Sequence, residues 1–168
     1  ELYLPDSWPS YFSKAKDCFV WDLNNKKFVD MYFGVGTNVL GYANKFVDSK
    51  VISKIRKGNM TSLNAPEEVE LAKKILELHP WASKVKFTRG GGEANAVAIR
   101  IARTFSKKQN VAFCGYHGWH DWYLAANLKS KDKLSHHLLP GIIPKGVPKH
   151  LKNSIIPFRF NNWEDLKR

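Results

Sequence analysis

The sequence predicts an α/β protein in which helices flank a mixed or mostly parallel sheet. Residues 85–114 run through an apolar stretch, three glycines, an amphipathic stretch and a second apolar stretch, which is typical of a strand, a helix and a parallel strand. Upstream, residues 18–31 alternate apolar and polar side chains, which indicates a β-hairpin. The chain has 168 residues and is 43% hydrophobic, so it can form a packed core and is not intrinsically disordered.

The N-terminal segment, residues 1–58, is expected to contain the hairpin and one helix. Asn24 and Asn25 tolerate the positive φ that a two-residue hairpin turn requires, so we expect the turn there. Residues 45–57 repeat apolar side chains at helical spacing, and Gly58 suits the left-handed residue that ends a helix. This pattern predicts an amphipathic helix.

Residues 59–168 are expected to form the first part of a larger domain. Asn64 as N-cap, a proline in the first turn and Glu67 at the capping-box position predict a helix that Pro80 ends. Further along, the sequence predicts a strand at 85–88, a helix at 93–106, a strand at 111–114, a short helix at 121–127, a long loop to about residue 153, an edge strand at 154–158 and a helix capped by Asn162.

The composition favours an ordinary cytoplasmic protein. The formal charge is +12, but the basic residues are spread along the chain without a nucleic-acid-binding motif, so we favour a solvated surface over a nucleic-acid role. No apolar run reaches the roughly 18–20 residues that span a bilayer, so we expect no membrane association. The two cysteines, Cys18 and Cys114, form neither a disulfide framework nor a Cys-x-x-Cys zinc pattern.

Three consecutive glycines, Gly90–Gly92, separate the predicted strand from the predicted helix. The first amides of a helix have no partner inside it, so glycines at this place form a cup that suits a phosphate. No Gly-Lys-Ser/Thr follows, which excludes a Walker loop, and the spacing misses the dinucleotide pattern. On the glycines alone, a tight turn is favoured. The charge of Glu93 would repel a phosphate unless its side chain points away.

A second group, residues 114–120, follows the next predicted strand. Because carboxyl ends of parallel strands meet at one sheet edge, we expect this loop and the glycine loop to converge. An aromatic side chain between glycines can stack on a flat ring, as a cofactor with a phosphate and an aromatic head requires. Core packing and structural histidines remain alternatives. His117 and His120 have no third ligand at suitable spacing, so we expect no metal site.

Residues 87–103 (FTRGGGEANAVAIRIAR) and 111–125 (VAFCGYHGWHDWYLA) resemble the class III aminotransferases of the fold type I pyridoxal-phosphate (PLP) enzymes, nearest the glutamate-1-semialdehyde aminomutase-like members. Family members read Ser-Gly-Thr-Glu-Ala-Asn in the phosphate loop and Tyr-His-Gly after the next strand. Residues 20–42 (VWDLNNKKFVDMYFGVGTNVLGY) also resemble the family's N-terminal segment. The resemblance covers nearly the whole chain and implies a PLP-dependent aminotransferase or aminomutase that acts on a small amino or keto substrate.

The resemblance implies roles for individual residues. Gly91 and Gly92 would offer amides to the phosphate of PLP, Tyr116 would stack on its pyridine ring, His117 and Gly118 would shape that wall, and Gly34, Gly36, Thr37 and Asn38 would lie on the substrate side. Two departures stand out. Glycine replaces the family's Ser and Thr at Gly90 and Gly92, so only amide donors remain, and the family's Leu-Gly-His is Leu40-Gly41-Tyr42 here.

The resemblance also implies that the chain is incomplete. In the family a lysine well downstream forms the Schiff base and an Asp pairs with the pyridine nitrogen, and no residue here matches either, so no catalytic residue is assigned. We therefore expect an incomplete fold type I sheet in a fragment that is inactive alone, and a homodimer in the complete enzyme. The alternatives are a non-catalytic basic module that binds nucleic acid or an acidic partner, and a nucleotide or sugar-phosphate binder.

Overall fold

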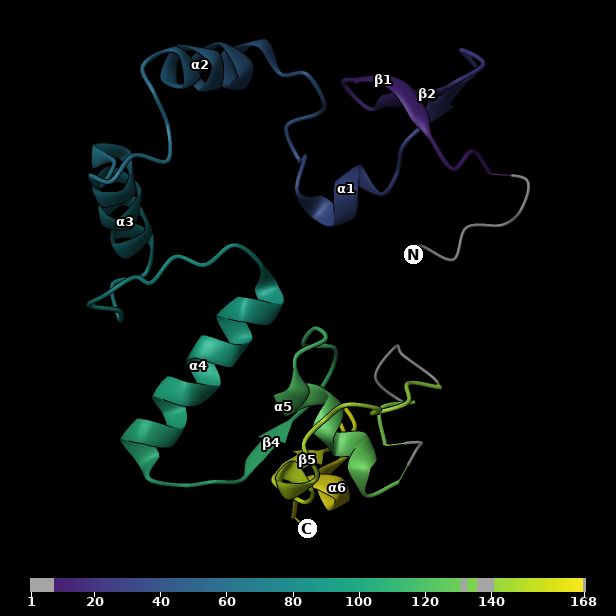
Figure 1. The fold of residues 1–168 in the computed structure, drawn as a ribbon, viewed down its shortest axis with the longest axis vertical. Helices are drawn as coiled ribbons and strands as arrows, with labels where there is room; N and C mark the ends of the chain where they lie inside the picture. The colour runs from purple at the N-terminus through teal and green to yellow at the C-terminus, as the bar shows by residue number, and fades with distance from the viewer. Residues whose placement is uncertain (1–7, 131–132, 136–140, 168) are drawn as a thin grey trace. The chain divides into compact units, whose positions relative to one another are not determined.

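The computed structural model describes residues 8–130, 133–135 and 141–167, and the chain divides into two compact units (Figure 1). These units are Glu1–Leu71 and Ala72–Arg168. The domain boundary after residue 58 stays a prediction. Of the predicted long loop that ends near residue 153, residues 131–132 and 136–140 lie outside the described residues.

The first unit begins with a three-stranded antiparallel sheet in the order β1-β2-β3. Its strands are β1 (Phe12–Lys16), β2 (Phe19–Asp22) and β3 (Lys27–Val29). The predicted hairpin is confirmed as β2 and β3, but its loop has three residues rather than two, because the Asp22 amide donates to the Lys26 carbonyl (3.1 Å). Asn25 takes the left-handed residue of this loop, with φ 62°. The sequence did not predict β1.

Helix α2 (Lys45–Arg56) confirms the predicted amphipathic helix. Asn44 caps it, since Oδ1 accepts from the amides of Phe46 (3.1 Å) and Val47 (3.3 Å). Helix α3 (Pro66–Leu78) begins one residue later than an Asn64 cap implies. The Glu67 carboxylate pairs with Lys54 Nζ (2.8 Å), so Glu67 links α3 to α2 instead of forming the expected capping box.

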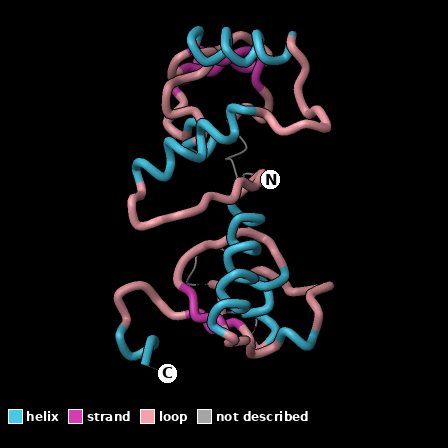
Figure 2. The backbone as a smooth tube through the Cα atoms, turned by 90° about the vertical axis from the view of Figure 1, so that its left-hand side faces the viewer, coloured by secondary structure: helices cyan, strands magenta, loops and turns pink. Residues whose placement is uncertain are grey.

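The second unit combines helices with one pair of parallel strands (Figure 2). Its elements are α4 (Gly91–Ser106), β4 (Val111–Phe113), α5 (Asp121–Leu124), η1 (Ala125–Leu128), η2 (Lys149–Leu151), β5 (Ile155–Pro157) and α6 (Trp163–Lys167). Most predicted elements of this unit are confirmed within a few residues. The chain between β4 and β5 supplies the long crossover that a parallel pair needs.

The predicted strand at 85–88 is wrong, because these residues form neither helix nor strand. A β-strand is held by its hydrogen-bonded neighbour, and within the described part of the chain no strand pairs with this segment. The predicted strand, helix and strand unit over 85–114 is therefore absent, and β4 pairs in parallel with β5 instead.

The core of the second unit lies between the strand pair and α5. Its buried hydrophobic residues are Phe113, Trp122, Tyr123, Ala125, Ala126, Leu134, Val147 and Ile155. Asn127 is buried among them, and its side chain donates to the Ile142 carbonyl (2.9 Å) and accepts from the Leu134 amide (3.0 Å). This amide side chain therefore ties two parts of the loop to η1, which explains how a Lys- and Pro-rich loop joins the core.

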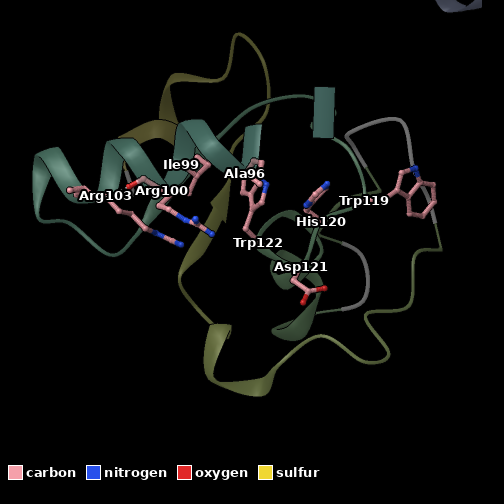
Figure 3. A pocket seen from close by; sticks show the side chains of 9 residues that line it. Ala96, Ile99, Arg100, Arg103, Trp119, His120, Asp121 and Trp122 are labelled. Atoms are coloured by element: carbon pink, nitrogen blue, oxygen red, sulfur yellow. Dashed lines mark hydrogen bonds between the residues drawn. The ribbon is translucent and has the colours of Figure 1, made fainter. Parts of the chain in front are cut away.

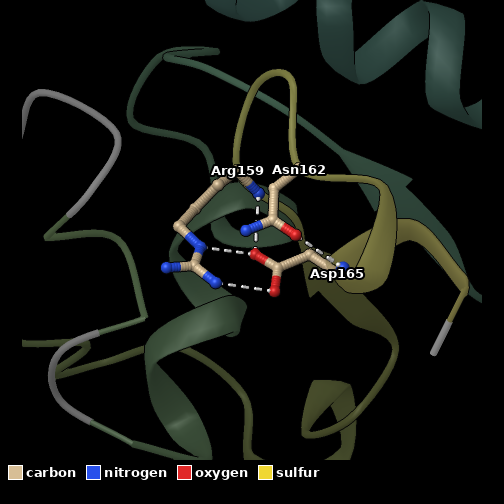
Figure 4. Close-up of polar contacts among 3 residues, drawn as sticks. All are labelled: Arg159, Asn162 and Asp165. Carbon is tan, nitrogen blue, oxygen red and sulfur yellow. Dashed lines mark hydrogen bonds and ion pairs between the residues drawn. The ribbon is translucent and has the colours of Figure 1, made fainter.

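The last helix, α6, confirms the predicted Asn162 cap, since its Oδ1 accepts from the Asp165 amide (3.0 Å). Asp165 also forms a two-pronged ion pair with Arg159, at 2.6 Å from Nε and 2.9 Å from a terminal nitrogen (Figure 4). Together these contacts fasten the start of α6 to the chain that leaves β5.

Candidate functional site

The glycine loop forms the N-terminus of α4. Gly90 is the N-cap, and its carbonyl accepts the first helical hydrogen bond, from the Ala94 amide (2.9 Å). The amides of Gly91, Gly92 and Glu93 consequently have no partner inside the helix, nor elsewhere in the described part of the chain. Three free amides at the positive end of a 16-residue helix can bind an anion.

The two predicted loops meet at Gly92 and Gly118. A Cβ on Gly118 would lie 2.9 Å from the Cα of Gly92, so the two backbones are in direct contact. A Cβ on Gly92 would lie 2.9 Å from Cδ2 of His120. Asn95 adds a long hydrogen bond from Nδ2 to the His117 carbonyl (3.5 Å). The expected reason for convergence, two adjacent parallel strands, does not apply, because residues 85–88 form no strand. The two loops meet instead through the contact between Gly92 and Gly118.

Tyr116 stands at the rim of these loops. Its side chain is 44% exposed, and its ring meets the buried Tyr123 ring edge-on at 5.9 Å. Edge contact fixes the ring while leaving it accessible, so it can stack on a planar ligand. Burial, together with the nearby Tyr116, raises the pKa of Tyr123 to about 12, so its phenol stays neutral at neutral pH.

His117 is built into an aromatic cluster. Its Nδ1 lies 3.1 Å from the Gly115 carbonyl, and its ring meets the Phe113 ring edge-on at 5.7 Å. Its environment fits a residue that shapes a wall. In the described residues, the Tyr123 hydroxyl and Trp122 Nε1 are buried without a hydrogen-bond partner. Unpaired buried donors are uncommon, so a polar group beside this cluster would gain a hydrogen bond.

Glu93 is held by the backbone in front of the helix. Its Oε2 accepts from the Arg89 amide (2.9 Å), close to the capping-box arrangement. The Glu93 carboxylate is therefore hydrogen-bonded to the backbone just before the glycine loop. This hydrogen bond holds one carboxylate oxygen against the Arg89 amide, but the charge of Glu93 stays in the first turn of α4, so repulsion of a phosphate remains the expectation.

An open groove of about 720 Å³ lies between α4 and the segment before α5 (Figure 3). Ala96, Ile99, Arg100, Arg103, Thr104, Trp119, His120, Asp121 and Trp122 line it. None of the five predicted cofactor residues lines this groove, so the groove adjoins the glycine contact without including it. His120 belongs to both, since it lines the groove and lies beside Gly92.

The predicted substrate-side residues lie in the first unit. The Thr37 hydroxyl donates to the Gly34 carbonyl (2.8 Å) and accepts from Asn38 Nδ2 (3.1 Å), so it is used within its own loop. Sequence reasoning assigned no role to Asn95. Its position four residues after Gly91 was the available signal, since that spacing places it over the first turn of α4.

The sequence model of the family "Aminotransferase class-III" matches residues 5–158. The chain belongs to this family. A glutamate-1-semialdehyde 2,1-aminomutase from Sulfurisphaera tokodaii is 31% identical over 163 residues, and a 3-aminobutyryl-CoA aminotransferase from Cloacimonas acidaminovorans is 30% identical over 166 residues. These matches cover 96% and 98% of this chain, but 38% and 36% of the two relatives. The chain therefore spans less than two fifths of their length.

Solved structures show that this class-III aminotransferase chain has the fold of transaminases. An omega-transaminase from Sphaerobacter thermophilus superposes with a TM-score of 0.80 at 21% identity, covering 98% of this chain and 38% of that one. A glutamate-1-semialdehyde aminomutase from Pseudomonas aeruginosa gives 0.71 at 20% identity, covering 95% and 35%. The mixed α/β fold with small sheets is thus the fold type I arrangement in incomplete form.

Across the described residues, no three His, Cys, Asp or Glu side chains gather as a metal site would require. Among the helices formed by these same residues, none combines the length and the apolar character needed to cross a bilayer.

Proposed function

We propose that this chain is the phosphate-binding part of a PLP-dependent class-III aminotransferase or aminomutase, which moves an amino group to or from a small carbonyl substrate. Its relatives include enzymes named for both activities, which supports the class of reaction. The observation that carries the proposal is the contact between Gly92 and Gly118, because it joins the helix start with the unpaired amides to the loop that carries the accessible ring of Tyr116.

The residues present fit the phosphate and the ring of PLP. The amides of Gly91 and Gly92 would bind the phosphate. Apart from its chain neighbours and the backbone of α4, no atom of the described residues lies within 4 Å of a Cβ placed on Gly91, which leaves room for the phosphate. Tyr116 would stack on the pyridine ring, while His117 and Gly118 would form the adjoining wall. When bound, PLP supplies a ring that accepts electrons from the carbon beside the amino group.

The complete reaction needs groups that this chain does not match. The resemblance implies a lysine that anchors the cofactor and an Asp that keeps its ring protonated, and no residue among the 168 is assigned to either role. We propose that the 168-residue chain binds PLP without turnover. Gly36, Thr37 and Asn38 would face the substrate in the complete enzyme, which we propose to be a cytoplasmic homodimer.

A ligand titration tests this proposal. PLP, pyridoxal and inorganic phosphate would be added to the chain while the tryptophan fluorescence is followed, since Trp122 packs in the same aromatic cluster as His117. We expect saturable quenching by PLP and at least about tenfold weaker binding of pyridoxal, because pyridoxal lacks the phosphate. Gly92→Asp, which places a carboxylate at the helix start, should weaken PLP binding similarly, whereas Gly146→Asp should not.

Two outcomes would contradict the proposal. Equal affinity for PLP and pyridoxal would show that the helix amides do not bind the phosphate. Stabilisation by nucleotides or sugar phosphates as strong as that by PLP would favour the alternative phosphate binder.

The alternative function, a basic module that binds nucleic acid or an acidic partner, can be tested by the salt dependence of binding. Lys27 Nζ lies 3.6 Å from the centroid of the Phe19 ring, and Lys14 Nζ lies 4.8 Å from that of the Trp21 ring. Two of the basic side chains therefore form cation–π contacts within the N-terminal sheet. Oligonucleotide affinity that falls steeply with salt would support that alternative.

A further inference from the structure

The loop that carries the predicted substrate-side residues begins with an unusual left-handed turn. The short element α1 (Phe33–Gly36) has positive φ throughout, at 47°, 57°, 59° and 81°. Glycine adopts such angles freely, but Phe33 and the β-branched Val35 do not. A turn of this kind persists only when surrounding contacts enforce it, and such turns concentrate at functional sites.

The carboxylate of Asp30 contacts both ends of the segment 30–42. Its Oδ1 accepts from the amides of Tyr32 (2.8 Å) and Phe33 (3.3 Å), just before the left-handed turn. Its Oδ2 accepts from the hydroxyl of Tyr42 (2.5 Å), twelve residues further along. One side chain thus closes the whole segment into a loop.

Asp30 and Tyr42 are themselves held by backbone hydrogen bonds to residues 17 and 18, next to the N-terminal sheet. The Asp30 amide donates to the Cys18 carbonyl (2.8 Å), and Tyr42 exchanges two backbone hydrogen bonds with Asp17 (2.8 and 2.9 Å). The Tyr42 ring also lies nearly parallel to that of Phe33, with centroids 6.1 Å apart and 9° between the planes. Tyr42 therefore holds the first residue of the left-handed turn by packing as well as through Asp30.

Thr37 and Asn38 are packed tightly against the left-handed turn. A Cβ on Gly34 would lie 2.8 Å from Thr37 Oγ1 and 2.9 Å from Asn38 Nδ2, so both side chains pack on the turn. The Asn38 amide donates back to the Phe33 carbonyl (3.1 Å). A change in the turn must consequently move Thr37 and Asn38.

We propose that Asp30 and Tyr42 form a clamp that positions the substrate-side residues Gly36–Asn38, an inference that rests on the proposed function. Both are positioning residues, since neither belongs to the predicted substrate-side set. The hydrogen bond from Tyr42 lowers the pKa of Asp30 and raises that of Tyr42, which agrees with a charged carboxylate accepting from a phenol. The family's Leu-Gly-His pattern has histidine where this chain has Tyr42, and histidine can also donate a hydrogen bond.

Nuclear magnetic resonance of the 168-residue chain tests the clamp with Tyr42→Phe. Loss of the hydroxyl should move the Asp30 carboxyl pKa upward toward its ordinary value. It should also accelerate hydrogen exchange at the Asn38 amide by about tenfold, the effect of losing one hydrogen bond to a charged group. Tyr32→Phe is the matched control, because it removes a phenol hydroxyl from the same loop without touching the clamp.

Tyr42→Phe itself separates the hydrogen bond from packing, because phenylalanine keeps the ring that stacks on Phe33. The proposal is overturned if Tyr42→Phe leaves the Asp30 pKa and the Asn38 exchange rate as they are in Tyr32→Phe. These readouts involve no PLP, so a chain that fails to bind PLP would refute the proposed function while the clamp data stand independently.

Discussion

Replacing Gly118 by alanine probes the backbone contact on which the candidate site depends. Gly118 has φ 95°, where an alanine is strained by roughly 1–2 kcal/mol. Its new Cβ would lie 2.9 Å from the Cα of Gly92, a backbone atom that cannot rotate away, and overpacking of this kind costs about 1–3 kcal/mol. The free energy of unfolding should therefore fall by about 2–5 kcal/mol, a large share of an ordinary domain's stability.

Two control variants divide this effect into its parts. Gly146 has φ 85°, and apart from its chain neighbours no atom of the described residues lies within 4 Å of a Cβ placed there, so Gly146→Ala reports the backbone strain. Gly91 has neither a positive φ nor a close neighbour, so Gly91→Ala should cost nothing and keep its amide. Urea unfolding followed by tryptophan fluorescence measures the free energy of unfolding of the three variants. PLP affinity should fall at least about tenfold in Gly118→Ala and stay nearly unchanged in Gly146→Ala, whereas Gly91→Ala serves as a control for stability alone. Equal destabilisation by Gly118→Ala and Gly146→Ala would refute the contact.

Three further predictions concern other parts of the chain. Asn127→Ala should lower the free energy of unfolding by about 2–4 kcal/mol in urea titrations, because it leaves the buried Leu134 amide without this partner and removes the part-buried hydrogen bond to the Ile142 carbonyl; a loss below that of an exposed Asn→Ala variant would contradict it. Asp165→Asn should reduce the chemical-shift helicity of α6, since the ion pair to Arg159 is lost (Figure 4); unchanged shifts would argue against that role. Because the pKa of Asp30 is lowered in the folded state, its stabilisation is present above the unfolded-state pKa and disappears as the pH falls through the folded value. The protection factor of the Asn38 amide, which is the intrinsic exchange rate divided by the observed rate at the same pH, should therefore fall in acid; a protection factor that falls between pH 7 and pH 9 would contradict this sign.

The elements that the sequence predicted correctly carry local signals. Asn162 caps α6 through a hydrogen bond three residues away, and Gly90 starts α4 where the glycines leave the helix amides uncovered. Amphipathic spacing located α2 in the same way. Each of these features depends on neighbours within about one helical turn, so a single sequence contains the information.

The features that the sequence missed depend on partners far along the chain. Residues 85–88 have the composition of a strand, but a strand also needs a neighbour, and none pairs with them in the described part of the chain. The hydrogen bond between Tyr42 and Asp30 joins residues twelve positions apart, and no local sequence pattern predicts it. The sequence did predict that the glycine loop and the loop of residues 114–120 converge. The predicted reason was a shared sheet edge, whereas in the structure the two loops meet through Gly92 and Gly118.

Amide chemical shifts recorded during a PLP titration show directly where the cofactor binds. We expect saturable shifts at Gly91–Glu93 and in the Tyr116–Gly118 loop, whereas the amides of Arg100 and Arg103 in the adjoining groove should not shift. Shifts confined to Arg100 and Arg103, or no saturable shift at the glycine loop, would show that the free amides of α4 do not hold the cofactor.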